Sequence, residues 1–293
     1  MFDAFQTNSN GRNAKNSFSG LRQTTLVANH HLLFGNTKAS SSGEVKPPSA
    51  DELLDYYTSD QLRAHWLALG LAQKSVSFSP KPFDKDKEKR LDPRAADPVL
   101  KEGTLITNVF NRFARSCFYT AQKYSDCQIK GMPVDKEVAT TVLETAEKYE
   151  RYMQKTELYS VMQLMDEFIR YANKYFSDNA SKIEENDELF LRNFLSNSFF
   201  MLYAAALMMH PIVPRGCEKI AECMNIPHAK FFNWNNFYET ELNEVALYNV
   251  QVRESLSTTS ATPTYSMNET RILKVKDLPP KFDFFRKHES QYK

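Results

Sequence analysis

The stretch from Leu105 to Tyr124, LITNVFNRFARSCFYTAQKY, decides the fold that the sequence predicts. Its apolar residues recur at three- and four-residue steps, which is typical of one buried face of a long helix. These residues are Ile106, Phe110, Phe113, Cys117, Ala121 and Tyr124. Asp97 followed by Pro98 offers an N-cap acceptor and a proline at the first helical position. We therefore expect a helix from Asp97 to Tyr124 with one face packed in a core.

A second stripe of the same helix is polar. It holds Asn108, Asn111 and Arg115, with Arg112 to one side. Amide and guanidinium groups can pair with base edges and phosphates, so one interpretation is an RNA-binding face. The other interpretation is an ordinary solvated helix surface.

Further apolar-periodic segments predict a mainly α protein built as an antiparallel helical bundle. They cover residues 135–154, 156–176, 189–209 and 214–224. The most apolar run, residues 198–209, is too short to cross a membrane and is soon followed by Pro211. We expect it to form the buried central helix of the bundle.

The region before the bundle has a different pattern. Residues 26–34 predict one strand, or two that meet around Asn29, and a polar loop of small residues follows over 35–43. Ser49 and Glu52 have the spacing of a capping box, which predicts the start of a helix. A second helix is expected from Thr58 to Gly70, and residues 74–96 read as a linker.

These patterns divide the chain into four segments. We expect a loosely ordered N-terminal segment over 1–25, the strand, loop and helix pair within 26–95, the bundle over 96–240, and a linker and arm over 241–293. Residues 278–285, LPPKFDFF, predict an extended arm whose aromatic side chains pack on the bundle.

Composition limits the possible partners and location. The net charge of +1 gives no global basic field, so any nucleic-acid contact must use a local patch. The four cysteines show no paired spacing, which favours free thiols in a reducing compartment. No secretory signal pattern opens the chain, so we expect a cytoplasmic protein without a membrane partner. His65 and His210 lie beside apolar residues and are expected to be structural, and no metal site is predicted.

The order of these features resembles the C-terminal half of the methionyl-tRNA synthetases. The resemblance covers residues 26–240 and rests on a strand, a Lys-x-Ser-x-Ser loop at 38–42, a helix pair carrying YTSDQLR at 57–63, Phe78, and a helix with Asn-x-x-x-Arg. It implies the end of a class I catalytic domain followed by an anticodon-binding helical domain. In the complete enzymes of this family the activity is ATP-dependent aminoacylation of tRNA.

The resemblance also implies roles for the loop. Lys38, Ser40 and Ser42 would contact ATP phosphates, but Ser41 replaces the second lysine of the family loop. The nucleotide-binding half of the family, with its His-x-Gly-His motif, is not in this sequence. We therefore expect no catalytic residue and no cofactor in this chain, and ATP only if a separate nucleotide-binding domain completes it.

For RNA, the resemblance assigns Asn111 and Arg115 to hydrogen bonds with anticodon bases, and we add Asn108 and Lys182 as contacts. Ser181-Lys182 replaces a Pro-Trp whose indole stacks on a base in the family. Such stacking contributes ~1–3 kcal/mol per base, so selectivity for one anticodon is expected to fall.

Three functions follow from these expectations. The first is a module that binds the anticodon stem-loop of tRNA. The second is a non-catalytic synthetase paralogue that acts as a protein-interaction or regulatory module. The third is completion of a synthetase together with a separate catalytic partner.

Overall fold

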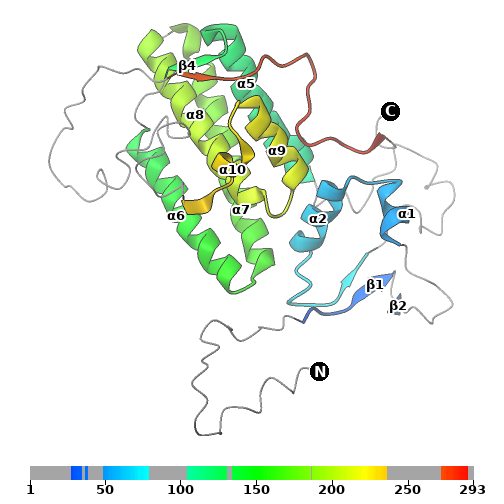
Figure 1. Cartoon of the computed structure of the whole chain (residues 1–293). Coiled ribbons are helices and arrows are strands. Elements are labelled where there is room, and N and C mark those ends of the chain that lie inside the picture. The colour runs from blue at the N-terminus through cyan, green and yellow to red at the C-terminus, as the bar shows by residue number, and fades with distance from the viewer. Residues whose placement is uncertain are drawn as a thin grey trace, which may run out of the picture.

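The structure is a helical bundle with a small strand-and-helix unit at one end, and the predicted mainly α class is confirmed (Figure 1). This computed structural model describes residues 28–34, 37–38, 49–78, 104–130, 134–185, 187–235 and 272–289. The expectations for the N-terminal segment and for the linker after residue 240 lie outside these residues.

The bundle follows the predicted order of helices. Its elements are the π-helix η3 (Leu105–Phe110), α5 (Asn111–Ser125), α6 (Lys136–Gln154), α7 (Leu158–Ala180), α8 (Glu188–Met209), α9 (Pro214–Cys223) and the short α10 (His228–Phe231). A short 3-10 turn, η4 (Ile183–Glu185), connects α7 with α8. Helix α7 continues to Ala180, beyond the end of the segment predicted over residues 156–176.

The predicted apolar stripe of the first long helix is confirmed. Its members Ile106, Phe110, Phe113, Cys117 and Ala121 are all fully buried, while Tyr124 is half-buried. The helix is not regular, however, because it opens as a π-helix in which the Asn111 N–H donates to the Ile106 carbonyl, five residues back. Such wide turns are rare and often lie at functional positions. Residues 97–103, where the helix was expected to begin, lie outside the described part of the chain.

Helix α8 is the buried centre of the bundle, as predicted. Nearly every side chain from Phe194 to Met209 is buried, which explains why this run has no polar face. None of the described helices is both long and apolar enough to cross a membrane.

The unit before the bundle consists of a three-stranded sheet and two helices. Strand β1 (Leu32–Phe34) pairs antiparallel with β2 (Thr37–Lys38) and parallel with β3 (Val76–Ser77). Strand β1 is thus shorter than predicted, and β3 lies where a linker was expected. Helices α1 (Ala50–Leu54) and α2 (Ser59–Ala68) pack with the sheet around a core of four residues, Leu53, Tyr57, Leu62 and Phe78.

The capping box predicted for the first of these helices is confirmed. The Ser49 N–H donates to Glu52 Oε2 at 2.7 Å, and the Glu52 N–H donates to Ser49 Oγ at 3.2 Å. Helix α2 has the same arrangement at Thr58 and Gln61.

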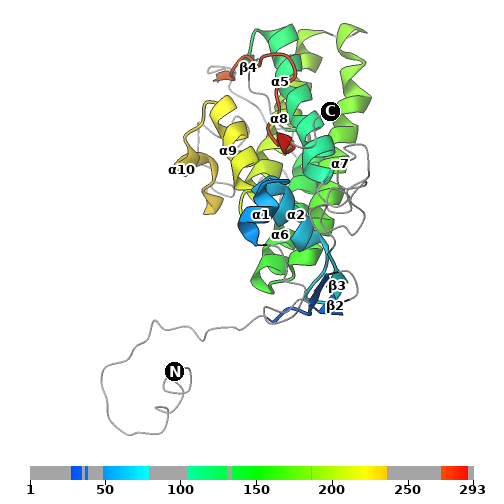
Figure 2. The same cartoon turned by 90° about the vertical axis from the view of Figure 1, so that its right-hand side faces the viewer.

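The C-terminal arm, residues 272–289, packs on the bundle as predicted. It begins with β5 (Ile272–Lys274), which pairs antiparallel with β4 (Gln128–Lys130) after α5. Neither short strand was predicted. The arm then crosses the bundle beside α5, as Figures 1 and 2 show in red. Its side chains Phe284 and Phe285 are 1% and 2% exposed, so they belong to the main core.

Candidate functional site

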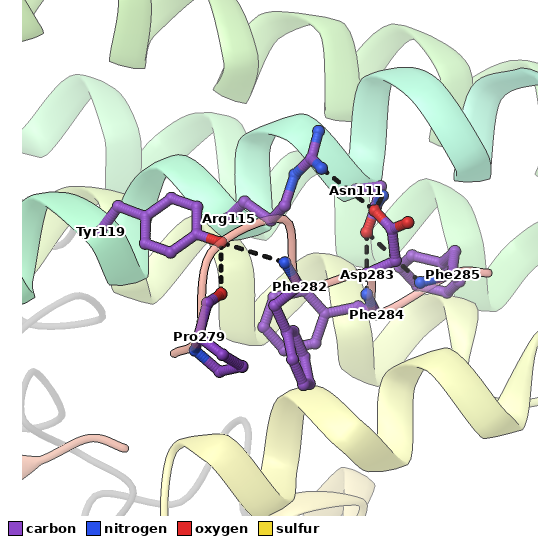
Figure 3. A network of polar contacts seen from close by, with 8 residues as sticks. All are labelled: Asn111, Arg115, Tyr119, Pro279, Phe282, Asp283, Phe284 and Phe285. Carbon is purple, nitrogen blue, oxygen red and sulfur yellow. Dashed lines mark hydrogen bonds and ion pairs between the residues drawn. The ribbon is translucent and has the colours of Figure 1, made fainter. Parts of the chain in front are cut away.

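Asn111 does not face solvent, because the C-terminal arm covers it. Its side chain is held by three hydrogen bonds to the arm (Figure 3). Nδ2 donates to Asp283 Oδ1 at 2.6 Å, and Oδ1 accepts from the N–H groups of Phe284 and Phe285 at 2.9 and 3.3 Å. Only 2% of Asn111 is exposed, so the expectation that it lies on an exposed polar stripe of the helix is wrong.

Arg115 lies one turn further along α5 and binds the same carboxylate. Its Nη1 is 3.1 Å from Asp283 Oδ1, in an ion pair whose side chains are 32% and 26% exposed. Arg115 is therefore at the edge of the covered area, and the remainder of its guanidinium carries no other hydrogen bond within the described residues. Since solvent screens a partly exposed pair, this contact is weaker than the buried bonds of Asn111.

Tyr119 completes the row one further turn along the helix. Its hydroxyl accepts the Phe282 N–H at 3.1 Å and donates to the Pro279 carbonyl at 2.9 Å. Residues at i, i+4 and i+8 share one helix face, so Asn111, Arg115 and Tyr119 form a continuous strip that we call the arm clamp. Sequence reasoning missed Tyr119, although the same four-residue step reaches it.

Aromatic contacts fix the arm beside the clamp. The rings of Phe285 and Phe110 have centroids 4.7 Å apart, and those of Phe284 and Phe118 are 5.3 Å apart. Helix α9 leaves room for this packing at Gly216, where an added Cβ would lie 2.1 Å from the ring of Phe285. A side chain at this position would displace the arm.

The other two predicted RNA contacts are not part of the clamp. Asn108 is exposed on η3, while Lys182 follows α7 and bonds to Asn179 Oδ1 at 3.3 Å. In the adjoining η4 turn, Glu184 is 3.4 Å from Lys123 Nζ at the far end of α5. Twelve residues of helix separate Asn111 from Lys123, roughly 18 Å along the axis. The four predicted residues therefore do not converge on one point.

The predicted ATP loop is only partly described. Lys38 lies in β2, where its backbone pairs with Leu33, and Ser40 and Ser42 lie outside the described residues. Their contact with ATP stays a prediction.

Helix α2 packs Ala64 against the main core, and two of its charged side chains also bond to helix ends of the bundle. The Asp60 carboxylate accepts the Gly216 N–H at 3.0 Å at the start of α9, and burial raises the pKa of Asp60 despite that bond. Arg63 donates to the carbonyls of Ile212 and Pro211, both at 2.7 Å, just after α8. An anion thus meets a helix N-terminus and a cation meets carbonyls at a C-terminus, which is the favourable arrangement at both ends.

Burial shifts the pKa of titratable groups in the helix pair and in the bundle. His65 lies on α2 with its ring 5.8 Å from that of Phe78, and burial lowers the pKa of His65 to about 4. All four cysteines are free thiols, as predicted, and burial raises the pKa of Cys117 and Cys217 well above the usual value. Within the described residues, no group of three or more His, Cys, Asp or Glu side chains could hold a metal ion.

The fold of this chain is similar to part of the fold of two solved synthetase structures. The chain is similar to methionyl-tRNA synthetase of Mycobacterium tuberculosis bound by methionyl-adenylate, with a TM-score of 0.58 and 17% identity over 87% of this chain and 43% of that one. It is also similar to the free form of the same synthetase, with a TM-score of 0.53 and 15% identity over 81% of this chain and 40% of that one. No protein-family model and no curated protein matches the chain. The chain thus spans less than half the length of these synthetases, and identities this low show the fold alone.

Proposed function

We propose that this chain is a synthetase-related RNA-binding module that contacts the anticodon stem-loop of a tRNA, within aminoacylation or translation. The observation that carries the proposal is the position of Arg115. It belongs to the Asn-x-x-x-Arg pair, lies on the long helix of a synthetase-like bundle, and keeps a third of its side chain exposed. A guanidinium at the edge of a folded surface is well suited to bind a phosphate or a base edge.

In this proposal the predicted RNA contacts have different roles. The side-chain amide of Asn111 is hydrogen-bonded to the arm, so the role of Asn111 in this proposal is to hold the arm in place. Arg115, the exposed Asn108 and Lys182 then carry the contact with RNA. Asn108 and Arg115 lie on the η3–α5 helix, and Lys182 follows α7. Because the three residues are spread over two helices, they fit the backbone of a stem-loop better than a single base.

Catalysis belongs to the proposal only in a restricted form. By resemblance the reaction is methionine–tRNA ligation with ATP, and Lys38, Ser40 and Ser42 would support it if a nucleotide-binding domain were added. We expect no ATP–pyrophosphate exchange with methionine by this chain alone. A clear exchange signal from the purified chain would contradict this.

The second candidate function is a non-catalytic interaction or regulatory module. The observation that favours it is the arm clamp, because Asn111, one of the two residues that resemblance assigns to anticodon bases, is hydrogen-bonded to the arm of the protein itself. A separate catalytic protein is one partner that such a module could bind.

Binding of labelled tRNA, compared with random single-stranded RNA over a range of salt concentrations, separates the two candidates. We expect tighter binding of tRNA, weakened in Arg115→Ala and unchanged in Lys148→Ala. Lys148 is an exposed lysine on α6, whereas Arg115 lies on α5. If tRNA binds no better than random RNA, the proposal fails and the interaction module is favoured.

A further inference from the structure

Arg112 is a cation of helix α5 that the arm clamp does not use. It is exposed, and its Nε donates to Asn173 Oδ1 of α7 at 3.3 Å. Consecutive residues of an α-helix point about 100° apart, so Arg112 points to a different side of α5 from Asn111 and the arm. Since α5 packs against α7, the guanidinium lies at the junction of these two helices. We call the pair Arg112–Asn173 the α5–α7 bridge.

The charge of Arg112 is not neutralised by a carboxylate. Helix α5 holds three cations, Arg112, Arg115 and Lys123, and no Asp or Glu. The second and third of these cations are each paired with a carboxylate. Within the described residues, Arg112 is in no ion pair, and its hydrogen-bond partner Asn173 is uncharged. The bridge therefore presents an uncompensated positive charge at the surface.

The carboxylates of α7 are engaged or lie on other faces of the helix. Asp166, seven residues before Asn173, is paired with Arg170 at 2.8 Å. Glu167 and Asp178 lie six and five residues from Asn173. Residues on one helix face recur at three- and four-residue steps, so these two carboxylates are not on the face of Asn173. The bridge thus keeps its positive charge.

The bond to Asn173 also determines how Arg112 presents its donors. It holds the guanidinium at Nε, and within the described residues the two terminal nitrogens carry no hydrogen bond. Two such donors in one plane match two oxygens of a phosphate. Asn108, an exposed amide one turn earlier on η3, offers a further neutral donor. The π-helix ends two residues before Arg112, and wide turns of this kind often lie at functional positions.

We propose that Arg112 binds a phosphate of the RNA backbone, and that Asn173 is the residue that positions its guanidinium. This inference rests on the proposed function and deepens it, because it places a strand of the stem-loop along the junction of α5 and α7. On this path RNA approaches α5 from the side of Arg112, and the arm stays in place on Asn111.

The test measures tRNA affinity against salt concentration for Arg112→Gln, with Arg151→Gln as the control of equal charge. Arg151 is exposed near the end of α6, just before α7 begins at Leu158, whereas Asn173 lies ~22 Å further along α7. We expect Arg112→Gln to bind about tenfold more weakly at about 0.1 M salt. Its log–log salt slope should be smaller by ~0.7–0.9, the value of one phosphate contact. Arg151→Gln should bind like the unmodified chain.

Two further variants separate a phosphate contact from a structural link between the helices. Arg112→Lys keeps the charge but loses the planar pair of donors, so the salt slope should return while part of the affinity stays lost. Asn173→Ala should bind about 2–5-fold more weakly with an unchanged slope, because it removes the positioning bond and no charge. Adding it to Arg112→Gln should cause no further loss. Since the bridge is exposed, thermal melts of all these variants should stay close to that of the unmodified chain.

The outcomes separate the inference from the proposed function. If the unmodified chain prefers tRNA while Arg112→Gln and Arg151→Gln bind it alike, the inference is overturned and the proposed function stands. If the unmodified chain does not prefer tRNA over random RNA, both fall. Equal losses of affinity and melting temperature in Arg112→Gln and Arg112→Lys would overturn the phosphate contact in favour of a structural link. A loss confined to one loop sequence among variant stem-loops would overturn it in favour of a base contact.

Discussion

The arm and the α1–α2 helix pair both pack on the bundle from outside, but they are attached in different ways. The arm inserts Phe284 and Phe285 into the main core and is fixed by the uncharged amide of Asn111. The helix pair keeps a small core of its own and reaches the bundle through Asp60 and Arg63, while only small or partly buried side chains of α2, chiefly Ala64, pack against the main core. The arm is therefore a part of the bundle, while the helix pair is docked at its rim.

The two segments meet at the start of α9. The Gly216 N–H donates to Asp60, and the ring of Phe285 fills the space that the missing side chain of Gly216 leaves. Thr58 Oγ1 also donates to the Arg286 carbonyl at 3.5 Å. The difference between the segments should thus appear in stability, because loss of arm contacts affects the whole bundle and loss of helix-pair contacts affects one end of it.

The largest effect is expected from Phe285→Ala. Removing a fully buried ring from a core costs about 3–5 kcal/mol of unfolding free energy. Leu189→Ala, at a side chain 56% exposed, is the control and should change little. Chemical denaturation measures both, and a cost below about 1 kcal/mol for Phe285→Ala would show that the arm is peripheral after all.

Asn111→Ala should follow. It leaves the N–H groups of Phe284 and Phe285 without an acceptor and removes a donor from Asp283. Unsatisfied buried groups cost about 1–3 kcal/mol each, and relaxation of the arm reduces the sum to about 2–4 kcal/mol. The same denaturation curves test this, with Asn108→Ala on the exposed part of η3 as the matched control. Equal stability of the two variants would contradict the clamp.

The helix pair should respond to pH through His65. Burial lowers the pKa of this side chain to about 4, below its usual value of 6.5, so the unfolded chain binds the proton more readily than the folded one. Stability is therefore fully present above pH 6.5 and is lost as pH falls toward 4, by up to about 3 kcal/mol. In His65→Gln this component of the pH dependence should disappear. A variant with the same pH profile as the unmodified chain would rule His65 out as its source.

The smallest effect is expected from Arg115→Ala. The ion pair with Asp283 is partly exposed, so its loss should cost about 1 kcal/mol. Arg170→Ala removes the more exposed pair with Asp166 on α7 and should cost a few tenths of a kcal/mol. Thermal melts of the two variants give the comparison. If Arg115→Ala were as damaging as Asn111→Ala, the charged part of the clamp would be its main component.

The structural features that depend on the spacing of residues near one another in the chain can be predicted from the sequence. The buried stripe of α5, the capping box at Ser49 and the central position of α8 all follow from periodicity and side-chain chemistry within one turn or two. Even the docking of the arm was predicted, because the aromatic residues of 278–285 need a core. The π-turn before Asn111 has no such local signal and was missed.

The contacts of the clamp could not be predicted in the same way. Asn111 and Asp283 are 172 residues apart, and a polar stripe on a helix looks the same whether water or a distant segment covers it. The pairing of an acidic side chain in an aromatic arm with an arginine on the helix is a signal that could have suggested it. The short pair β4–β5, which sets the start of the arm, is equally non-local.

Amide hydrogen exchange at Phe284 and Phe285, with and without saturating tRNA, tests most directly whether the arm stays on Asn111 when RNA binds. Both N–H groups donate to the Asn111 side chain, so they report on the clamp itself. We predict that they exchange as slowly as the bundle core, and that tRNA leaves them equally or more protected. Faster exchange at these two amides in the tRNA complex would show that RNA displaces the arm to reach Asn111, and would contradict the arrangement proposed above.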